Sequence, residues 1–391
     1  MRRLRDSVGL QMSSVRLQLL TSSMCRMSCA AAGSKALSRP RAALPHCRPS
    51  EELIAPVRRT AAESSRLAST ATNCFMFRQQ RASSSTVVID TKQFSDESRT
   101  AMASGDTIKY ERIERGSLYG LDYRIFISGP CGVISPWHDV PLFADEANKI
   151  YNMIVEIPRW TNAKMEMATA ESMNPIKQDT KKGLPRFVHN IFPHKGYIWN
   201  YGALPQTWEN PNHIVPDTGA KGDNDPIDVI EIGSKVQPRG SVVQVKIVGT
   251  LALIDEGETD WKLVAIDIKD PQAAHVNSIA DVEKHFPGLL KATVEWFRIY
   301  KIPTGKPENK FAFNGEYKDS DYAHDVIMKT HEHWKSLIKE VSPKLNTQCF
   351  VDGAVHKATK ESAKEAVNST APLAAQSSLP EDIDKWHFIS A

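Results

Sequence analysis

The sequence has few cysteines, no long apolar run and no internal repeat. Four of its six cysteines lie within the first 89 residues, which leaves only Cys131 and Cys349 in the rest of the chain. Two distant cysteines make no disulfide framework, and without a CxxC pair there is no sign of a zinc site. Apolar stretches such as residues 251–254 are far shorter than the roughly 20 residues of a membrane-spanning helix. We therefore expect a reducing compartment and no membrane segment.

Acidic residues are scarce at the start of the chain and abundant in the remainder. Residues 1–89 contain thirteen Arg, one Lys and only four acids, a balance of +10; the whole chain carries +3, so the remainder is about seven charges negative. A protein that binds nucleic-acid phosphates would favour a basic body. An acidic body suits bound divalent cations better, and we expect no direct binding of nucleic acid.

The composition of residues 1–89 is typical of a mitochondrial transit peptide, because it is rich in Arg, Ser and Ala and has no period that could bury a face. A disordered arm or a translated upstream region would have the same composition. Met102, followed by Ala103-Ser104-Gly105, resembles a second start that would yield a cytoplasmic product. We expect an extension over residues 1–89, a linker over residues 90–109 and a mitochondrial location, in the matrix, for the full-length chain.

Strand patterns dominate the chain from residue 110 to about residue 270, where Gly, Pro, Asn and Asp interrupt short apolar runs. The alternation along residues 153–158 places Glu156 on the face opposite Val155. Residues 242–251 and 264–268 read as long, largely buried strands.

Beyond Pro271 the apolar period becomes helical. Ser278 can cap one helix, residues 289–300 form a second, and apolar residues between 323 and 338 line one face of a third. The pattern predicts an α+β catalytic domain with a mainly β core over residues 110–342. Residues 343–391, rich in Ala, Ser, Lys and Glu, are predicted to be a flexible tail.

The densest functional signal is the run Asp223-Asn224-Asp225-Pro226-Ile227-Asp228. Pro226 disfavours helical geometry at Asp225, so three carboxylates lie close together in extended chain and need protons or cations nearby. Oxygen ligands without His or Cys select a hard ion such as Mg²⁺. An ordinary Asp/Asn/Pro turn would show the same pattern. An EF-hand loop is excluded, because Asp228 occupies the sixth position, where Gly is required.

A second acidic group lies at residues 255–262, between two apolar strands. It would meet the first group if both lie at strand ends, although a solvated hairpin loop explains it equally well. Cationic and phenolic side chains could complete such a site. They are Arg159, Lys164, Lys181, Lys182, Arg186, Lys262, Lys301, Tyr197, Tyr201 and Tyr300. A substrate that needs many carboxylates and many cations together is a polyphosphate presented as its metal complex.

Six runs carry a resemblance to a known family. They are VEIPRWTNAKME (155–166), FPHKGY (192–197), NYGA (200–203), GDNDPIDV (222–229), DEGETDWK (255–262) and RIYKIP (298–303). In this order and without a visible gap they resemble the eukaryotic family I soluble inorganic pyrophosphatases, over about residues 110–340. The resemblance implies a closed, five-stranded OB-like β-barrel surrounded by α-helices, and a homodimer. It also implies Mg²⁺-dependent hydrolysis of pyrophosphate to two phosphates by direct attack of a metal-activated water.

The resemblance further implies a role for each site residue. Asp225 would take the proton of the attacking water as general base. Several Mg²⁺ ions, for which Mn²⁺ could substitute, would be held by Asp223, Asp228, Asp255, Asp260, Glu166 and Glu156. Pyrophosphate, bound as its magnesium complex, would be contacted by Lys164, Arg186, Tyr197, Tyr201, Lys262, Tyr300 and Lys301.

One stretch departs from the family pattern, which usually reads Lys-Lys-Gly-Lys-Leu-Arg. Here the chain reads Lys181-Lys182-Gly183-Leu184-Pro185-Arg186, so a lysine is lost and Pro185 removes a backbone donor next to Arg186. Because of this departure, the family pattern alone does not fix the position of Arg186.

An alternative of another class is an OB-like binding module or a scaffold subunit, including a chromatin-associated second role.

Overall fold

The structure is a computed structural model that describes residues 85–87, 108–130 and 132–389, and for residues 85–87 it describes the backbone alone. The expected transit peptide and linker fall almost entirely outside these residues, as does the alternative start at Met102. Among the described helices, none combines the length and the apolar character that crossing a membrane requires.

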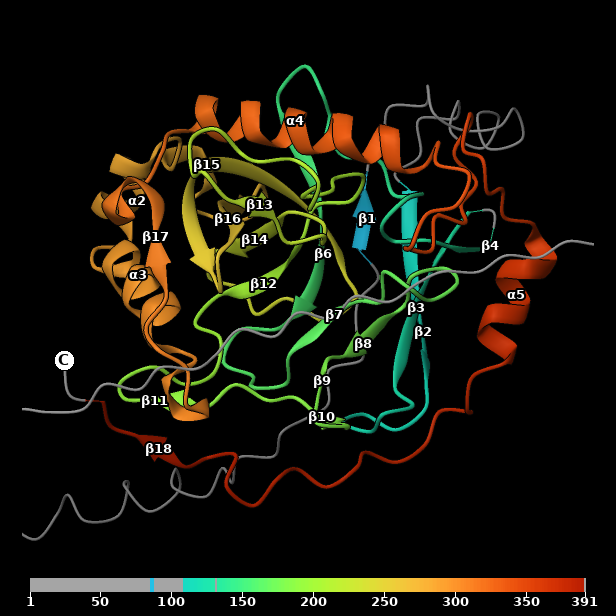
Figure 1. The fold of residues 1–391 in the computed structure, drawn as a ribbon, viewed down its shortest axis with the longest axis horizontal. Coiled ribbons are helices and arrows are strands. Elements are labelled where there is room, and N and C mark those ends of the chain that lie inside the picture. The colour runs from blue at the N-terminus through green and yellow to red at the C-terminus, as the bar shows by residue number, and fades with distance from the viewer. Residues whose placement is uncertain (1–84, 88–107, 131, 390–391) are drawn as a thin grey trace, which may run out of the picture. The chain divides into compact units, whose positions relative to one another are not determined.

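The largest sheet among the described residues has eight strands (Figure 1). Its members are β5 (Phe143–Asp145), β6 (Ile150–Ile157), β12 (Asn200–Ala203), β13 (Lys221–Gly222), β14 (Asp228–Glu231), β15 (Val242–Asp255), β16 (Glu258–Asp267) and β17 (Lys310–Phe311). The pairings run from β16 to β14, β12, β6 and β15, and β15 pairs with β16 again. Strands β14 and β16 are parallel, and the other four pairs are antiparallel. The predicted long strands are confirmed as β15 and β16.

The remaining strands form a six-stranded sheet and two small pairs. The six-stranded sheet contains β1 (Ser85–Val87), β2 (Ile108–Arg115), β3 (Arg124–Gly129), β4 (Gly132–Ile134), β7 (Met165–Met167) and β8 (Ile176–Gln178). The pairs are β9 (Thr180–Lys181) with β10 (Leu184–Pro185), and β11 (Asn190–Ile191) with β18 (Trp386–His387).

Strand β6 separates two apolar clusters, because its side chains alternate between them. Met153 and Val155 belong to the cluster that also contains Ala323 and Ile327 of α4, whereas Ile154 belongs to the cluster around Trp199. Glu156 lines a cavity, at the point where the register between β6 and β12 shifts.

The described helices follow the long strands in the chain. They are α2 (Ile279–His285), α3 (Leu289–Ile299), α4 (Ser320–Leu337) and α5 (Lys360–Asn368), with the short 3₁₀ segments η1 (Ala273–His275), η2 (Ile302–Thr304) and η3 (Ala312–Gly315). Ser278 caps α2 as predicted, since its side-chain oxygen accepts a hydrogen bond from the backbone N–H of Asp281. The predicted apolar face of α4 is confirmed, because Ala323, Ile327 and Trp334 are buried on it. Figure 1 shows α4 lying across β15.

An aromatic cluster fixes α3 to the chain that leads into β12. Trp199 stacks on Phe297 with ring centroids 4.9 Å apart, and its indole N–H donates to Thr293 at 2.8 Å. Trp296 donates to the carbonyl of Gly196 at 2.7 Å. The turn that follows α3 is therefore held beside β12 by buried aromatic surface.

Residues 343–389 differ from the flexible tail predicted for residues 343–391. Helix α5 lies in this segment, and its buried residues Ala363 and Val367 pack in an apolar cluster with Phe126 of β3. The apolar positions on this short helix are small, which is why the composition alone did not indicate a packed segment.

The end of the chain is also bonded to the rest. The backbone N–H of Gly116 donates to the carbonyl of Ala371 at 3.0 Å, and the backbone N–H of Ala374 donates to the carbonyl of Gly116 at 3.0 Å. Strand β18 then pairs in parallel with β11. Figure 1 shows this segment passing below the strands toward β11.

Candidate active site

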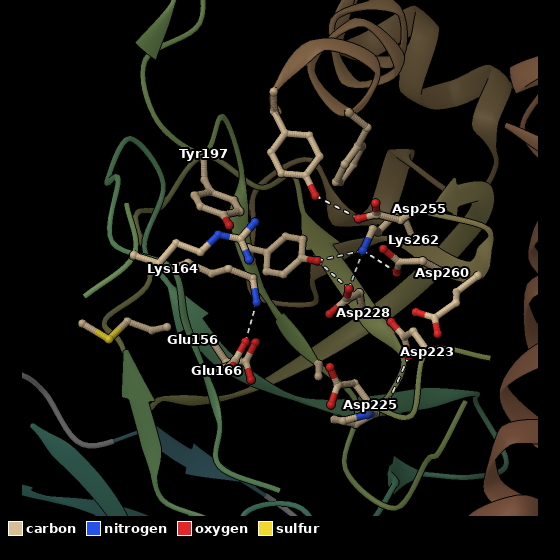
Figure 2. Close-up of a pocket in the computed structure, with 18 of the residues that line it drawn as sticks. Glu156, Lys164, Glu166, Tyr197, Asp223, Asp225, Asp228, Asp255, Asp260 and Lys262 are labelled. Carbon is tan, nitrogen blue, oxygen red and sulfur yellow. Dashed lines mark hydrogen bonds and ion pairs between the residues drawn. The ribbon is translucent and has the colours of Figure 1, made fainter. Parts of the chain in front are cut away.

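One cavity of about 280 Å³ is lined by all fourteen residues to which the sequence analysis gave a role (Figure 2). They are Glu156, Lys164, Glu166, Arg186, Tyr197, Tyr201, Asp223, Asp225, Asp228, Asp255, Asp260, Lys262, Tyr300 and Lys301. These residues come from β6, β7, β12, β14, β15 and β16, from the turn before β14 and the turn after α3, and from the segments just before β7, just after β10 and before β12. The two acidic groups therefore converge, as expected of carboxylates at strand ends. The individual roles stay predictions.

The wall of the cavity is strongly acidic. Nine carboxylate side chains and four cationic side chains line it, so its formal charge is negative before any ligand is bound. Carboxylates confined in this way repel one another, and they need protons or added cations to be stable together. The charge excess fits a site that takes up metal ions.

Lys262 lies at the centre of the acidic wall. Its side chain is only 3% exposed, and its ammonium bonds to Asp228, to Asp260 at 2.5 Å and to the Tyr201 hydroxyl at 2.9 Å. Burial alone would lower the pKa of Lys262, but the charges of Asp228 and Asp260 raise it well above its usual value. Lys262 thus remains charged and offsets the repulsion between the two carboxylates (Figure 2).

The Asp-rich turn directs two carboxylates into the cavity. The backbone N–H of Asp225 donates to the Asp223 carboxylate at 3.0 Å, which fixes the turn between β13 and β14. Asp225 is accessible to solvent, yet confinement by the cavity wall and the charge of Glu166 raise its pKa to about 7. A carboxylate with a pKa near neutrality can exchange a proton with a reacting water.

Glu209 is a site residue that the sequence analysis missed. Glu209, Asp223 and Asp260 offer carboxylate oxygens that lie within 4.8 Å of one another. Oε1 of Glu209 accepts from the backbone N–H of Trp261 at 3.1 Å, whereas its buried Oε2 has no hydrogen-bond partner. Burial and the charges of Asp223 and Asp260 raise the pKa of Glu209 well above its usual value. An orphaned carboxylate oxygen beside two further carboxylates is the ligand set of a hard cation.

Backbone pairing brings Glu209 to the Asp-rich turn. Glu209 donates to the carbonyl of Asp225 at 2.9 Å, and Asn224 donates to the carbonyl of Glu209 at 2.9 Å. Gly222 permits this approach, because a Cβ at that position would lie 2.4 Å from the backbone of Glu209. No local sequence pattern marks Glu209, since this pairing joins segments thirteen or more residues apart.

A second set of charges lies on the opposite wall, where Figure 2 shows Lys164 and Glu166 side by side. Lys164 pairs with Glu166 and lies 3.5 Å from Asp179. Burial opposes its charge, but Glu166, Tyr197 and Asp179 raise the pKa of Lys164 well above its usual value. Glu156 is buried, and it accepts from the backbone N–H of Met167 at 2.7 Å.

The turn after α3 brings a third group into the cavity. Tyr300 donates to Asp255 at 3.1 Å, and Lys301 pairs with Asp255 and with Glu256, the latter at 3.1 Å. Burial, followed by the charge of Asp255, raises the pKa of Tyr300 well above its usual value, so its hydroxyl remains a hydrogen-bond donor.

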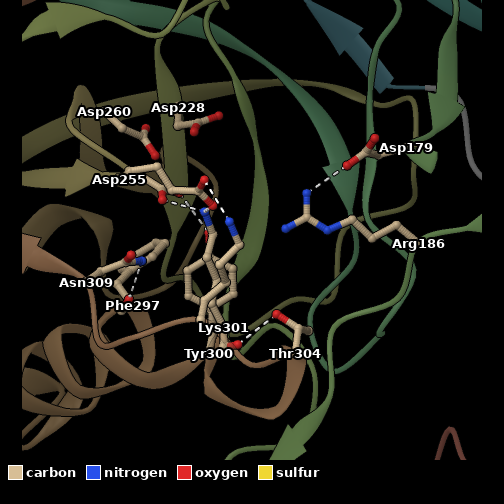
Figure 3. Close-up of polar contacts among 12 residues, drawn as sticks. Asp179, Arg186, Asp228, Asp255, Asp260, Phe297, Tyr300, Lys301, Thr304 and Asn309 are labelled. Carbon is tan, nitrogen blue, oxygen red and sulfur yellow. Dashed lines mark hydrogen bonds and ion pairs between the residues drawn. The ribbon is translucent and has the colours of Figure 1, made fainter. Parts of the chain in front are cut away.

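Arg186 reaches the cavity despite the departure at Pro185. Its guanidinium donates to Asp179 at 2.8 Å, and Figure 3 shows it pointing across the space toward Lys301. Strands β9 and β10 form a hairpin in which Leu184 pairs with Lys181 and Pro185 pairs with Thr180. Arg186 follows directly after this hairpin. Asp179, which the sequence analysis did not single out, thus holds both Arg186 and Lys164.

Three cations from the sequence analysis do not line this cavity. Arg159 instead donates to the carbonyl of Gly233 at 2.5 Å, on another part of the surface. Lys181 and Lys182 lie on the exposed β9–β10 hairpin. The pairing register of the β9–β10 hairpin determines where the side chains of Lys181 and Lys182 point, and the sequence pattern does not reveal that register.

Comparisons with known proteins agree on one family. The family model described as inorganic pyrophosphatase matches residues 153–335. Inorganic pyrophosphatase 1 of Caenorhabditis elegans is 67% identical over 291 residues, which cover 74% of this chain and 68% of that protein. The inorganic pyrophosphatase of Homo sapiens is 52% identical over 278 residues, which cover 70% of this chain and 96% of that protein. The solved structure of inorganic pyrophosphatase from Schistosoma japonicum matches with a TM-score of 0.69 at 51% identity, covering 71% of this chain and 100% of that chain.

Proposed function

Since this chain belongs to the inorganic pyrophosphatase family and hydrolyses pyrophosphate, we propose that its reaction depends on Mg²⁺ and proceeds by direct attack of water. The enzyme is an inorganic diphosphatase, a hydrolase that splits a phosphorus anhydride into two phosphates. The observation that carries the proposal is the meeting of nine carboxylates and four cations in one cavity. A polyanionic substrate and its neutralising metal ions need both kinds of group.

The residues present fit hard metal ions. Carboxylates outnumber cations, and the cavity contains no cysteine or histidine among its described lining residues. Glu209, which has one buried oxygen without a hydrogen-bond partner, clusters with Asp223 and Asp260. The residues proposed to hold the ions are Glu156, Glu166, Asp223, Asp228, Asp255 and Asp260, with Glu209 added to them. When bound, Mg²⁺ neutralises phosphate oxygens and lowers the pKa of water, and Mn²⁺ is proposed as a substitute.

Asp225 is proposed to accept the proton of the attacking water. Its pKa of about 7 suits a base that works near neutral pH, and its position on a turn fixed by Asp223 keeps the carboxylate in the cavity. The reaction then needs no covalent intermediate, because water itself attacks phosphorus while Asp225 takes up the proton.

Cationic and phenolic groups are proposed to grip the phosphates. Arg186 and Lys301 face each other across the space in Figure 3, and Lys164 lies beside Arg186 through their shared partner Asp179. Tyr197, Tyr201, Lys262 and Tyr300 complete the proposed substrate contacts. Fixed cations stabilise the charge of the leaving phosphate more strongly in a confined cavity than in water.

The ring of pairings through β16, β14, β12, β6 and β15 is proposed to be the closed, OB-like barrel of the family. The pairing of β15 with β16 over residues 245–255 supports the closure. The surrounding of this barrel by helices is part of the same proposal. The site lies where several of the strands end.

A homodimer is proposed from exposed aromatic surface. Phe192 is 59% exposed and contacts Trp386 and Phe388, which are 39% and 78% exposed. Three large aromatic side chains gathered on a surface are typical of a protein contact. Sedimentation velocity of the wild-type chain and of Phe192→Ser tests this: a dimer that dissociates in the variant is expected, and two identical monomers would contradict it.

Localisation is proposed from residues 1–89 and from Met102. The full-length chain is proposed to enter the mitochondrial matrix, and a product that starts at Met102 is proposed to remain in the cytoplasm. Fractionation followed by N-terminal sequencing of each endogenous product is the test.

The alternative of a binding or scaffold subunit gains no support from the described residues or from the comparisons.

The proposed reaction is tested by phosphate release from pyrophosphate in Mg²⁺ and in EDTA. We expect release with Mg²⁺ and a loss of at least about a hundredfold in EDTA. Equal rates in both buffers would contradict the dependence on metal.

A further inference from the structure

A small cavity outside the candidate active site lies against helix α4. Its volume is about 40 Å³, little more than the roughly 30 Å³ that one water molecule occupies in the liquid. Much of its wall is apolar, because Val215, Pro216, Trp261 and Val326 line it. A ligand of this cavity must therefore be an ion or a molecule of about the size of water.

Two histidine rings meet at this cavity. His333 comes from α4, and His213 comes from the segment between β12 and β13. Their ring centroids lie 4.9 Å apart, and their ring planes make an angle of 56°. Nδ1 of His333 is buried and has no hydrogen-bond partner. Buried polar atoms are rarely left without a partner, and a bound ligand would supply one here.

The spacing of the two rings matches that of two imidazoles bound to one metal ion. A zinc ion lies about 2.0–2.1 Å from an imidazole nitrogen and the ring centre is roughly 1.1 Å further out, so each centroid is about 3.2 Å from the ion. Two such centroids are about 5.2 Å apart at a tetrahedral angle and about 4.5 Å apart at a right angle. The observed 4.9 Å lies between these values.

The charges around the cavity favour a cation. Two carboxylates, Glu209 and Asp217, line it, whereas Lys329 is the one lysine or arginine among its described lining residues. Burial and the neighbouring His213 lower the pKa of His333, although an interaction with the backbone of Trp208 opposes this shift. His333 is therefore neutral near pH 7, and a neutral imidazole offers a lone pair to a metal ion.

We propose that this cavity is a binding site for one divalent transition-metal ion such as Zn²⁺, held by His213 and His333. Imidazole nitrogen selects such ions over Mg²⁺, which prefers oxygen ligands. Within the part of the chain that the structure describes, only Glu209, Asp223 and Asp260 form a group of three potential ligands, so water completes the coordination at the two histidines. The ion is additional to those of the proposed reaction and lies beside Glu209, which lines this cavity as well.

Equilibrium dialysis against Zn²⁺ measures the number of ions bound by the full chain. Excess Mg²⁺ occupies the carboxylates of the active site, and alkylation with iodoacetamide blocks the accessible cysteines. At micromolar free Zn²⁺ we expect His213→Gln and His333→Gln each to bind one ion fewer per chain than the wild-type chain. His213 is exposed, so a loss of folding does not explain the result for that variant.

His275→Gln is the matched control for both variants. His275 is also exposed, and it does not line this cavity or the active site. Its substitution should leave the number of bound ions unchanged. Equal Zn²⁺ binding by the wild-type chain and His333→Gln, or an equal loss in His275→Gln, would overturn the site.

Lys329→Glu gives a test of opposite sign. Lys329 lies one turn before His333 on α4 and lines the cavity, so the substitution removes a repelling charge and adds a carboxylate. Zn²⁺ should bind several-fold more tightly at low salt, which a loss of folding could not produce. Lys335→Glu makes the same change in net charge on the same helix but does not line the cavity. Unchanged or weaker binding in Lys329→Glu, or equal tightening in Lys335→Glu, would contradict the proposal.

Anomalous diffraction at the zinc edge locates the ion in crystals grown with both Zn²⁺ and Mg²⁺. We expect a peak between the rings of His213 and His333. No histidine occurs among the described lining residues of the active-site cavity, so zinc in that cavity is recognised by its carboxylate ligands. Peaks confined to that cavity would refute the histidine site, and the proposed hydrolysis would stand unaffected.

Discussion

Asp228 and Lys262 are register partners on the parallel strands β14 and β16, and their side chains form an ion pair on the wall of the cavity. Side chains at paired positions of neighbouring strands lie on the same face of a sheet. Strands β14 and β16 are about 30 residues apart in the chain, and their pairing places the buried ammonium of Lys262 among the proposed metal ligands. The site is a consequence of strand register as much as of residue type.

Lys262→Met should raise the affinity for Mg²⁺ and lower the rate of hydrolysis. The ammonium lies 2.5 Å from Asp260 and also pairs with Asp228, so it competes with a metal ion for the same carboxylates. We expect Mg²⁺ to bind several-fold more tightly by titration calorimetry, and kcat/KM to fall about a hundredfold because a cation at the phosphates is lost. The control is Lys221→Met, an exposed lysine on β13 that should change neither value. Weaker Mg²⁺ binding in Lys262→Met would contradict this account.

Glu209→Gln should weaken metal binding without unfolding the metal-free chain. The amide can still accept from the backbone N–H of Trp261, but it no longer offers a charged oxygen beside Asp223 and Asp260. We expect the dissociation constant for Mg²⁺ to rise about tenfold, since a neutral oxygen is a weaker ligand for a hard ion. Mg²⁺ titration and urea unfolding in EDTA measure the two properties.

The exposed Glu283→Gln serves as the control for Glu209→Gln and should leave metal affinity unchanged. Glu209 would be excluded from the metal site if Glu209→Gln bound Mg²⁺ as tightly as the wild-type chain.

Asp179→Asn should raise KM for pyrophosphate and leave Mg²⁺ affinity unchanged. Asp179 is a positioning residue, because it accepts from Arg186 at 2.8 Å and lies 3.5 Å from Lys164. Without its charge both cations lose a shared partner, and we expect KM to rise about tenfold. Steady-state kinetics at saturating Mg²⁺ measure it, with the exposed Asp384→Asn as control. A fall in kcat at constant KM would instead show that Asp179 acts in the chemical step.

The sequence predicted the parts of the site whose signals are local. Asp223, Asp225 and Asp228 lie within six residues, and Pro226 marks their extended geometry, so local chain geometry alone brings these carboxylates close together. The same holds for the cap at Ser278, where a hydroxyl precedes Asp281 by three residues.

Residues placed by long-range pairing were not predicted. Glu209 reaches the cluster through backbone bonds to Asp225 and Asn224, and Asp179 reaches Arg186 across the β9–β10 hairpin. Neither residue stands in a pattern that marks a ligand. Helix α5 was missed for a related reason, because small residues such as Ala363 bury a face only when a partner such as Phe126 is nearby.

Stability should fall as the pH falls from about 6.5 toward 4, because His138 is buried as a neutral ring. Nδ1 of His138 accepts from the Trp334 indole at 2.9 Å, its Nε2 lies 3.0 Å from the carbonyl of Asn346, and burial lowers its pKa to about 4. The unfolded chain, with a pKa near 6.5, binds a proton in this window that the folded chain does not bind. The stabilising contribution is therefore present above pH 6.5 and is lost on acidification, with a size of up to about 3 kcal/mol.

Urea unfolding at pH 5 and pH 7 tests the role of His138. His138→Gln keeps one acceptor and one donor but cannot titrate, so the difference in unfolding free energy between the two pH values should shrink relative to wild type. The exposed His275→Gln should leave the difference unchanged. An unchanged difference in His138→Gln would assign the acid sensitivity to other groups.

The most direct test of the proposed chemistry is phosphate release from pyrophosphate by the wild-type chain and by Asp225→Asn, each with Mg²⁺ and with EDTA. The substitution keeps the shape of the side chain and removes its ability to accept the proton of water. We expect rapid, Mg²⁺-dependent release by the wild-type chain and a rate lower by about a hundredfold or more in Asp225→Asn. Equal release by both proteins, or none by either in the presence of Mg²⁺, would contradict the assignment of Asp225 as the base of a metal-dependent pyrophosphatase.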